Sequence, residues 1–389
     1  MDFDPATEHP LDPFPHYERM RTAAPVYLDE PTGSWHVFRY DDVQRVLSDH
    51  ATFSSRMGGD ESSEAGHLFA SSLITTDPPR HRQLRSLVTQ AFTPRAVDEL
   101  APRISELTDG LLDGIASRGS ADLIEELAYP LPVIVISELM GIPAEHRDRF
   151  KQWSDAIVSQ TRTGAATEDH QAANQEMTGY FLDLIEQRRR MPGDDLISNL
   201  LAAEIDGQKL NVAELLGFCA LLLVAGNETT TNLIGNAVLC FTEVPGTVDR
   251  LVNEPGLLPQ AIEEVLRFRS PVQSMYRVTA ADASLGGTRI PAGAPVVAWI
   301  GSANRDERQF ERPAEFDVDR GQTRHLAFGH GIHFCLGAPL ARLEARIALD
   351  AVLSRLPGLA LAPDAHLERM DSTIVYGLTA LPVSWQARS

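Results

Sequence analysis

The spacing of apolar residues divides the chain into a strand-like start, a long helical middle and a mixed final part. The runs VYLDE and WHVFRY flank Pro31, Thr32, Gly33 and Ser34, a pattern typical of a β-hairpin. The segment DDVQRVLSDH, which follows, has helical spacing. From about residue 91 to 207, apolar positions recur every three or four residues, and Pro or Gly separates the segments. We therefore expect a small sheet followed by a mostly helical region.

The longest predicted helix lies near the centre of the chain. Asn211 and Glu214 have the spacing of a capping box, and the next proline is Pro245. A helix over this stretch has about 33 residues, or ~50 Å at a rise of ~1.5 Å per residue. Its apolar run LLGFCALLLVAG ends after twelve residues at Asn227 and Glu228, which is too short to span a bilayer. The pattern predicts a buried helix that crosses the molecule.

The pattern changes again after residue 267. Proline, glycine and short β-like runs such as GGTRIPAGAPVVAWIG precede a return to helix after Cys335, and STIVYGL and PVSWQ are strand-like. The sequence contains neither an internal repeat nor a clear linker. Domains of ~150 residues would suggest two or three units, but we predict one domain over residues 1–389. It is mainly α with minor antiparallel β, and its small β-rich part lies at about residues 20–60.

Composition narrows the class of protein. The 54 acidic residues outnumber the 34 basic ones, which argues against general nucleic-acid binding. Three widely separated cysteines make a disulfide framework improbable and favour a reducing, cytoplasmic location. The N-terminal MDFDPATEHPLDPFPHYERM is acidic and proline-rich, so it reads as neither a signal peptide nor a membrane anchor.

Cys335 stands in a setting that ordinary packing does not require. Gly329, Gly331 and Gly337 surround it and allow close backbone approaches, and a helix begins just after it. The positive end of that helix favours the thiolate, the form of cysteine that binds metals. An inert buried cysteine is one alternative; a zinc site with neighbouring histidines is another, but structural zinc needs four protein ligands in recognised spacings. A thiolate on haem iron fits better, because there one sulfur suffices.

The segment AGNETT places Glu228 and Thr229 between the apolar runs LLLVAG and LIGNAVLC. Burying a carboxylate is costly unless it is paired or hydrated, and helical threonines can bond back to the preceding turn. A kinked helix with a solvated face is the structural alternative. The apolar flanks instead favour a cavity lined by these two side chains.

Two further pairs lie on helix faces. In EEVLR, Glu264 and Arg267 are three residues apart, and in DPPRHRQLR, His81 and Arg85 are four apart. Alone, the first pair would be interpreted as a surface ion pair and the second as a solvated basic turn.

Together these segments resemble the cytochrome P-450 family, in its soluble bacterial form. FGHGIHFCLG, residues 328–337, is similar to the family signature Phe-Gly-x-Gly-x-x-x-Cys-x-Gly, and AGNETT, EEVLR and ANRDERQFERPAEFDVDR occur in the expected order along the whole chain. The resemblance implies a fold shaped as a triangular prism, with a long central helix over a haem b.

The resemblance also assigns residues. Cys335 would be the iron ligand, with Phe328 and Gly337 beside the haem, and four basic side chains would hold its propionates: His81, Arg85, Arg277 and His333. Glu264 and Arg267 would pair with Arg320 in a folding role. Glu228 and Thr229 match the acid–alcohol pair that supplies protons while oxygen is activated.

Two positions depart from the commonest pattern. Glu228 stands where Asp is more usual, which keeps an acid with a longer reach. Glu307 replaces a frequent proline after Asn304-Arg305-Asp306, a change expected to touch only a surface loop. His325 and His330 receive no chemical role.

Family substrate contacts map onto a largely apolar set of side chains, with Gln273 and Ser274 as orienting groups. The predicted pocket residues are Leu73, Ile74, Val224, Ala225, Val272, Gln273, Met275, Ile374 and Val375. They suit a medium-sized hydrophobic molecule such as a terpenoid, steroid, fatty acid or polyketide.

The resemblance predicts a monooxygenase that inserts one atom of O2 by hydroxylation or epoxidation. The four-cysteine spacing of an iron–sulfur cluster is absent, so electrons would come from NAD(P)H through a ferredoxin reductase and a ferredoxin. We expect an acidic ferredoxin to dock on four arginines of a monomeric enzyme: Arg80, Arg82, Arg342 and Arg346. The alternatives are a peroxygenase that uses hydrogen peroxide and a non-catalytic haem-fold binding protein.

Overall fold

The computed structural model describes residues 11–56, 72–89, 94–146, 148–150, 152–153, 156, 168–204, 207–321, 323–370 and 372–387. The chain forms two compact units. Unit 1 comprises Met1–Phe53, Glu99–Leu131 and Thr229–Ser389, and unit 2 comprises Ser54–Asp98 and Pro132–Glu228. Each unit is described by itself.

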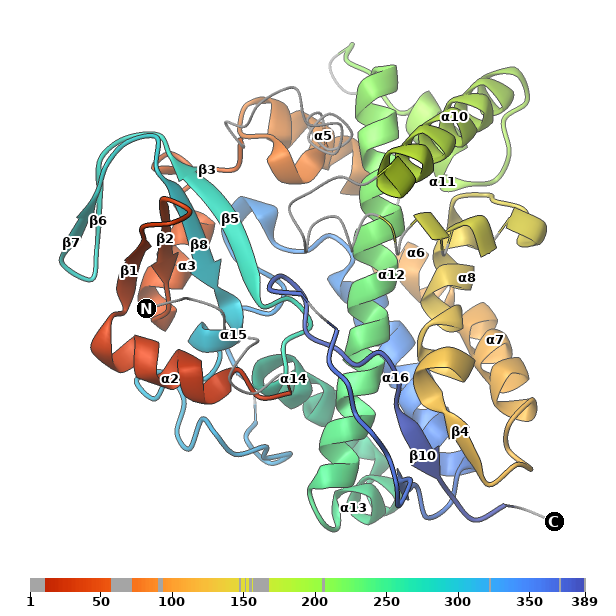
Figure 1. Ribbon diagram of the computed structural model, residues 1–389. Helices are drawn as coiled ribbons and strands as arrows, with labels where there is room; N and C mark the ends of the chain where they lie inside the picture. Colours follow the sequence, from red (N-terminus) through yellow and green to blue (C-terminus); the bar gives the residue numbers. More distant parts are fainter. Residues whose placement is uncertain are drawn as a thin grey trace. The chain divides into compact units, whose positions relative to one another are not determined.

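Unit 1 contains a mixed sheet whose strand order is β1-β2-β8-β5-β3 (Figure 1). The predicted hairpin is confirmed, since β1 (Val26–Asp29) and β2 (Ser34–Val37) pair antiparallel. β8 (Pro295–Trp299) pairs parallel with β2 and antiparallel with β5 (Ser274–Thr279), and β3 (Phe53–Ser54) forms the edge. This parallel pair differs from the antiparallel expectation, and its two strands lie more than 250 positions apart in the sequence.

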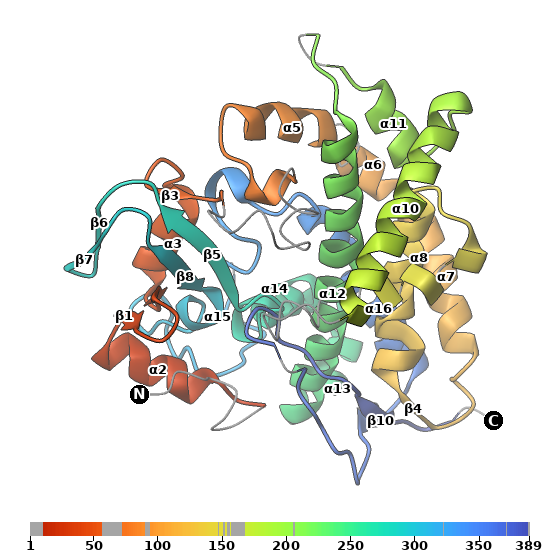
Figure 2. The same ribbon diagram turned by 45° about the horizontal axis from the view of Figure 1, so that its top comes forward.

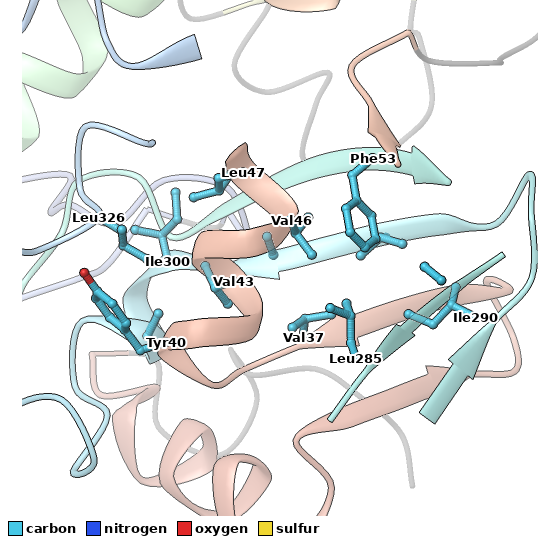
Figure 3. Packing of buried hydrophobic residues seen from close by; sticks show 14 of the residues in the cluster. Val37, Tyr40, Val43, Val46, Leu47, Phe53, Leu285, Ile290, Ile300 and Leu326 are labelled. Carbon is cyan, nitrogen blue, oxygen red and sulfur yellow. The ribbon is translucent and has the colours of Figure 1, made fainter. Parts of the chain in front are cut away.

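The helix α3 (Tyr40–Ser48) follows the hairpin, as predicted, and packs in one apolar cluster with residues of the sheet. Val43, Val46 and Leu47 lie on its buried face, and Phe53 from β3 belongs to the same cluster (Figure 3). The cluster also includes residues of β6 (Ala283–Leu285), β7 (Thr288–Ile290) and α15 (Ile300–Ala303). This core fixes the position of α3.

Aromatic residues build a second cluster around α2 (Phe14–Ala23). Tyr17 contacts Trp299 of β8, and the Phe38 and Trp299 rings stack with an interplanar angle of 3°. Tyr376, near the C-terminus, packs on Phe14. Both ends of the chain are therefore tied to the same sheet.

The remaining elements of unit 1 are helical, apart from a small sheet of order β4-β10-β9. α7 and α14 both pack on α16. The elements are α7 (Ala101–Asp113), β4 (Ser120–Asp122), the π-helical η2 (Ile124–Ala128), α13 (Thr247–Asn253), η4 (Pro255–Leu257), α14 (Leu258–Phe268), η5 (Gly331–His333), α16 (Ala338–Arg355), β9 (Ala360–Leu361) and β10 (Pro382–Ser384).

The described parts of residues 91–207 are mostly helical, as the periodicity predicts, whereas residues 157–167 lie outside the described residues. In unit 2, Asp195 caps α11 by accepting a hydrogen bond from the Ser198 N–H, and Arg188 contacts the same carboxylate. The elements are η1 (Leu73–Thr75), α5 (Arg80–Thr89), α6 (Pro94–Asp98), η3 (Ala144–His146), α10 (Glu168–Arg190) and α11 (Leu196–Ala202); α8 (Pro130–Leu139) begins in unit 1.

The long central helix is α12 (Val212–Glu243), unbroken over its 32 residues and shared by both units (Figure 2). Its predicted capping box is confirmed, because the Asn211 side chain accepts from the Glu214 N–H at 3.0 Å and Glu214 accepts from the Asn211 N–H at 2.9 Å. Among the described residues, α12 alone is long and apolar enough to cross a membrane, a property that core helices of water-soluble proteins share.

Candidate functional site

The Cys335 loop is held tightly within unit 1. Cys335 donates its backbone N–H to the Phe328 carbonyl at 2.8 Å, which closes the loop. Gly329 and Gly331 have φ of +73° and +71°, a region that side chains other than glycine rarely adopt. A Cβ on Gly331 would lie 2.8 Å from the Ser48 Cα, so glycine is also required for the loop to approach α3.

Cys335 differs from the other two cysteines in accessibility. None of the three forms a disulfide, but Cys219 and Cys240 are fully buried in α12, whereas Cys335 is partly exposed. Burial raises the pKa of Cys219 to about 12 and also raises the pKa of Cys240, so both remain thiols. Cys335 precedes the first turn of α16, where the helix dipole favours a thiolate. This cysteine alone combines access with a suitable environment for binding a metal ion.

A buried ion-pair cluster fixes the segment before the loop. The Glu264 carboxylate accepts from Arg267 at 2.7 and 2.8 Å and from Arg320 Nε at 3.0 and 3.1 Å, and Arg267 has no exposed surface. Arg267 also donates to the carbonyls of Asn304 and Pro313. The structure therefore brings together the three residues predicted for this role.

Glu307 does more than occupy a surface loop, contrary to the sequence-based expectation. Its Oε2 accepts a hydrogen bond from the Arg21 Nε at 3.1 Å, and Arg21 is only 3% exposed. Arg21 also donates to the Ser302 carbonyl and hydroxyl. A buried cation on α2 thus needs the carboxylate that replaces the usual proline.

The polar segment of α12 combines a buried acid with an accessible face. Glu228 is 6% exposed, and its neighbour Thr229 is half-buried. Ala225, four residues before Thr229 on the same helix face, is exposed although the surrounding sequence is apolar. This face can therefore receive a ligand beside a hydroxyl and an acid.

The four basic residues predicted to hold propionates occur in both units. Arg277 on β5 is 4% exposed and donates to the Tyr276 carbonyl, and His333 lies in η5 of the Cys335 loop. His81 is buried and Arg85 half-buried on α5 of unit 2. Arg277 and His333 thus belong to the same unit as Cys335, whereas His81 and Arg85 belong to unit 2.

Part of the predicted substrate set is assembled in unit 1. Val272 and Val375 form an isolated β-bridge, and the Gln273 N–H donates to the Ile374 carbonyl at 2.7 Å, so the two segments lie side by side. Met275 on β5 is partly buried against the sheet cluster. Leu73 and Ile74 lie in η1, and Val224 and Ala225 in α12, all within unit 2.

The polar groups of Gln273 and Ser274 are committed to the fold. Gln273 accepts from the Tyr17 hydroxyl at 3.1 Å and donates to the Ser270 carbonyl at 2.7 Å, and the Ser274 hydroxyl donates to the Thr373 carbonyl at 3.1 Å. Both side chains are buried. These bonds argue against the substrate-orienting role that the sequence suggested for them.

Two of the four predicted docking arginines are already neutralised. Arg80 makes two hydrogen bonds of 2.7 and 2.6 Å to Glu214, and Arg342 makes two of 2.6 and 2.8 Å to Glu263. Arg82 and Arg346 are exposed on their helix surfaces. Because paired arginines attract an acidic partner less strongly, Arg82 and Arg346 would contribute most to a docking surface, and docking at this set of arginines stays a prediction.

Comparison with known proteins decides the family. Residues 27–374 match the Cytochrome P450 family. The chain belongs to the cytochrome P450 family. It is 46% identical to "Putative cytochrome P450 YjiB" of Bacillus subtilis (strain 168), over 95% of this chain and 93% of the relative. It is 43% identical to "Cytochrome P450 monooxygenase PikC" of Streptomyces venezuelae, over 96% of this chain and 91% of the relative.

Solved structures show the P450 fold. The crystal structure of CYP109E1 from Bacillus megaterium in complex with testosterone has a TM-score of 0.91 and 44% identity, covering 97% of this chain and 98% of that one. CYP109Q5 from Chondromyces apiculatus also has a TM-score of 0.91, at 40% identity, covering 99% of this chain and 98% of that one. This P450 is therefore an oxidoreductase of the monooxygenase class, for which the family implies a haem-iron cofactor.

The described residues fit a haem on the evidence of their own chemistry. Cys335 offers the thiol of a partly exposed residue, and the buried Arg277 together with His333 supplies hydrogen-bond donors suited to carboxylates. When bound, the iron supplies the redox chemistry that activates O2. The chain's part is to hold the group, shape the cavity and move protons.

Sequence reasoning missed one group of residues beside the loop. Glu263 contacts both His325 and Arg342, and the Arg342 guanidinium lies 4.4 Å from the centroid of the Phe328 ring. The sequence signal for this group was the first acid of EEVLR, Glu263, because the pair that the family resemblance assigned, Glu264 and Arg267, uses the second acid. His325, to which no role was assigned, proves to be part of this group.

Proposed function

We propose that this P450 inserts one oxygen atom from O2 into a medium-sized hydrophobic molecule, by hydroxylation or epoxidation. The observation that carries the proposal is the accessible Cys335 in a glycine-shaped loop at the start of α16. The proposed cofactor is haem b with Cys335 as the iron ligand, held at its propionates by Arg277 and His333 and, from unit 2, by His81 and Arg85. Phe328 and Gly337 would border it.

Glu228 and Thr229 would manage protons on the distal side. A buried carboxylate beside a half-buried hydroxyl can take up a proton from solvent and pass it inward. Their presence favours the O2-dependent reaction over peroxygenase chemistry, which does not require this pair. A non-catalytic binding role would not need the accessible cysteine and the acid–alcohol pair together.

The substrate class follows from apolar side chains and from relatives. The proposed contacts are Leu73, Ile74, Val224, Ala225, Val272, Met275, Ile374 and Val375. Gln273 is hydrogen-bonded within the fold, so it would support these residues. Relatives at 42% identity include "Vitamin D(3) 25-hydroxylase" of Pseudonocardia autotrophica and "Erythromycin C-12 hydroxylase" of Saccharopolyspora erythraea. We therefore favour steroids and polyketide macrolides over smaller terpenoids and linear fatty acids.

A titration of the purified protein with a substrate panel tests this assignment. Steroids and macrolides should shift the haem from low to high spin, because an apolar ligand on the exposed face of α12 displaces water. A V375W variant should weaken the response to the bulkiest ligands. Absence of any spin shift with all four compound classes would reject the proposed substrate class.

We further propose a cytoplasmic monomer reduced by a ferredoxin, itself reduced through a reductase by NAD(P)H. The exposed Arg82 and Arg346 would meet the acidic carrier, since Arg80 and Arg342 are paired. Reversing both charges (R82E and R346E) should slow reduction and flatten its salt dependence. Unchanged rates at low and high salt would reject this docking site.

A further inference from the structure

Glu263 lies at the centre of a compact charged group beside the cysteine loop. Its Oε1 accepts from Arg342 Nε at 2.6 Å, and its Oε2 accepts from Arg342 Nη2 at 2.8 Å. The His325 Nε2 lies 3.1 Å from the same Oε2. Burial alone would raise the pKa of Glu263, but the hydrogen bonds from Arg342 and His325 outweigh burial and hold its pKa at about 2. The carboxylate is therefore a permanent anion that joins two elements, α14 and α16.

His325 is oriented by both of its ring nitrogens. The Ala327 backbone N–H donates to Nδ1 at 3.2 Å, so we assign the ring proton to Nε2, which donates to Glu263. Its side chain is only 4% exposed, and its ring centroid lies 6.1 Å from that of Phe328. The histidine thus packs against the aromatic ring that begins the cysteine signature.

Arg342 contacts the same ring. Its guanidinium carbon lies 4.4 Å from the Phe328 centroid, within the range of a cation–π interaction. The two hydrogen bonds to Glu263 set the plane of the guanidinium, so the carboxylate determines how Arg342 meets the ring. Phe328 is therefore contacted by two side chains that share one anion.

Phe328 in turn is hydrogen-bonded to Cys335 through the backbone. Its carbonyl accepts the backbone N–H of Cys335 at 2.8 Å, so the backbone positions of the two residues are coupled. The next residue of α14, Glu264, enters the separate Arg267 and Arg320 cluster. Two adjacent carboxylates on one helix thus fix two different segments.

We propose that Glu263, acting through Arg342 and His325, is a positioning residue for the Cys335 thiolate: it holds Phe328 in place and balances the Arg342 charge beside the Phe328 ring. The inference rests on the proposed thiolate ligation. It separates two effects, since Glu263 contributes a negative charge and also a geometric constraint. Removing the charge should raise the reduction potential, because an unbalanced cation stabilises the more negative ferrous form.

Three variants of the haem-loaded protein separate these effects. In E263Q the reduction potential should shift to more positive values. On heating, its ferrous carbon monoxide complex should also convert from the thiolate band to the shorter-wavelength band about tenfold faster than in the wild type, which corresponds to an activation free energy lower by ~1.36 kcal/mol. R342K keeps the charge but loses the two-bond geometry, so its conversion should accelerate while its potential stays near that of the wild type. The matched control is D109N, which removes a carboxylate partner of Arg355 from the far end of α16 and should change neither property.

The outcomes are distinguishable. If the wild-type protein shows no thiolate band, the proposed function fails, independently of Glu263. If the wild type shows the band and E263Q matches D109N in both potential and conversion rate, the positioning role is rejected. If E263Q and R342K accelerate conversion equally but neither shifts the potential, the charge-balancing part is rejected and the geometric part stands.

Discussion

The indole N–H of Trp299 donates a hydrogen bond of 3.0 Å to Nδ1 of His36, which joins β8 to β2 in the sheet of unit 1. Nδ1 must be unprotonated to accept this bond, so the fold requires neutral His36. Burial lowers the pKa of His36 to about 4, although Asp29 acts in the opposite direction. A buried histidine that must stay neutral makes stability depend on pH.

His36 should destabilise the protein in mild acid. Its folded-state pKa lies below the unfolded value of 6.5, so its contribution is present above pH 6.5 and is lost as pH falls toward 4. Over this window the loss is about 3 kcal/mol. Urea unfolding at several pH values should show a falling midpoint in the wild type and a flatter profile in H36Q, whose amide can accept the Trp299 bond without titrating. Parallel profiles would contradict the assignment.

Glu344 should act in the opposite pH range. It is buried in α16, no described residue hydrogen-bonds its Oε2, and burial raises its pKa to about 8. The contribution of Glu344 to stability is therefore complete below pH 4.5 and is lost as the pH rises through 8. E344Q keeps the shape without the charge, so at pH 8 it should be more stable than the wild type by about 4 kcal/mol, with little difference at pH 4.5. Equal unfolding midpoints of E344Q and the wild type at pH 8 would show that burial of the Glu344 carboxyl does not destabilise the protein at this pH.

Thr229 should control how reducing equivalents are used. T229A removes the hydroxyl beside the buried Glu228, so proton supply fails and electrons are lost as hydrogen peroxide. We expect product formed per NAD(P)H to fall by at least about tenfold, since general acid catalysis contributes ~10²-fold or more. T229S, which keeps the hydroxyl, should retain most of the coupling. Product and peroxide should be measured in the same reactions. The role of Thr229 is contradicted if both variants form as much product per NAD(P)H as the wild type.

Glu307 should contribute to folding through Arg21. E307A leaves a 3% exposed guanidinium whose remaining partner among the described residues is Ser302, and we expect a cost of about 1 kcal/mol because Glu307 itself is partly exposed. The control is E315Q, which weakens an exposed ion pair with Arg312 and should cost almost nothing. Thermal unfolding of the two variants gives the comparison, and indistinguishable midpoints would contradict the contribution of Glu307.

Local signals in the sequence predicted local structure well. The β1–β2 hairpin, the Asn211–Glu214 capping box and the glycines before Cys335 each depend on residues a few positions apart. The resemblance to a family added Glu264, Arg267 and Arg320, which the structure brings together. Both kinds of signal are patterns of residue types along the sequence.

Contacts between distant segments were not predictable. The parallel β2–β8 pair and the Arg21–Glu307 bond join residues more than 250 positions apart, and no periodicity encodes such a partner. Gln273 illustrates the same limit, because a polar residue in an apolar segment suits either a ligand or the fold. Its bonds to Tyr17 and Ser270 decide in favour of the fold.

The central claim is that Cys335 binds the haem iron as a thiolate. The most direct measurement is the absorption spectrum of the reduced, carbon-monoxide-bound protein for the wild type, C335S, C219A and C240A. We predict the long-wavelength thiolate band in the wild type and in both α12 variants, and its loss in C335S alone, because the other two sulfurs are fully buried. A C335S protein that kept this band, or its loss in C219A or C240A with Cys335 intact, would contradict the account.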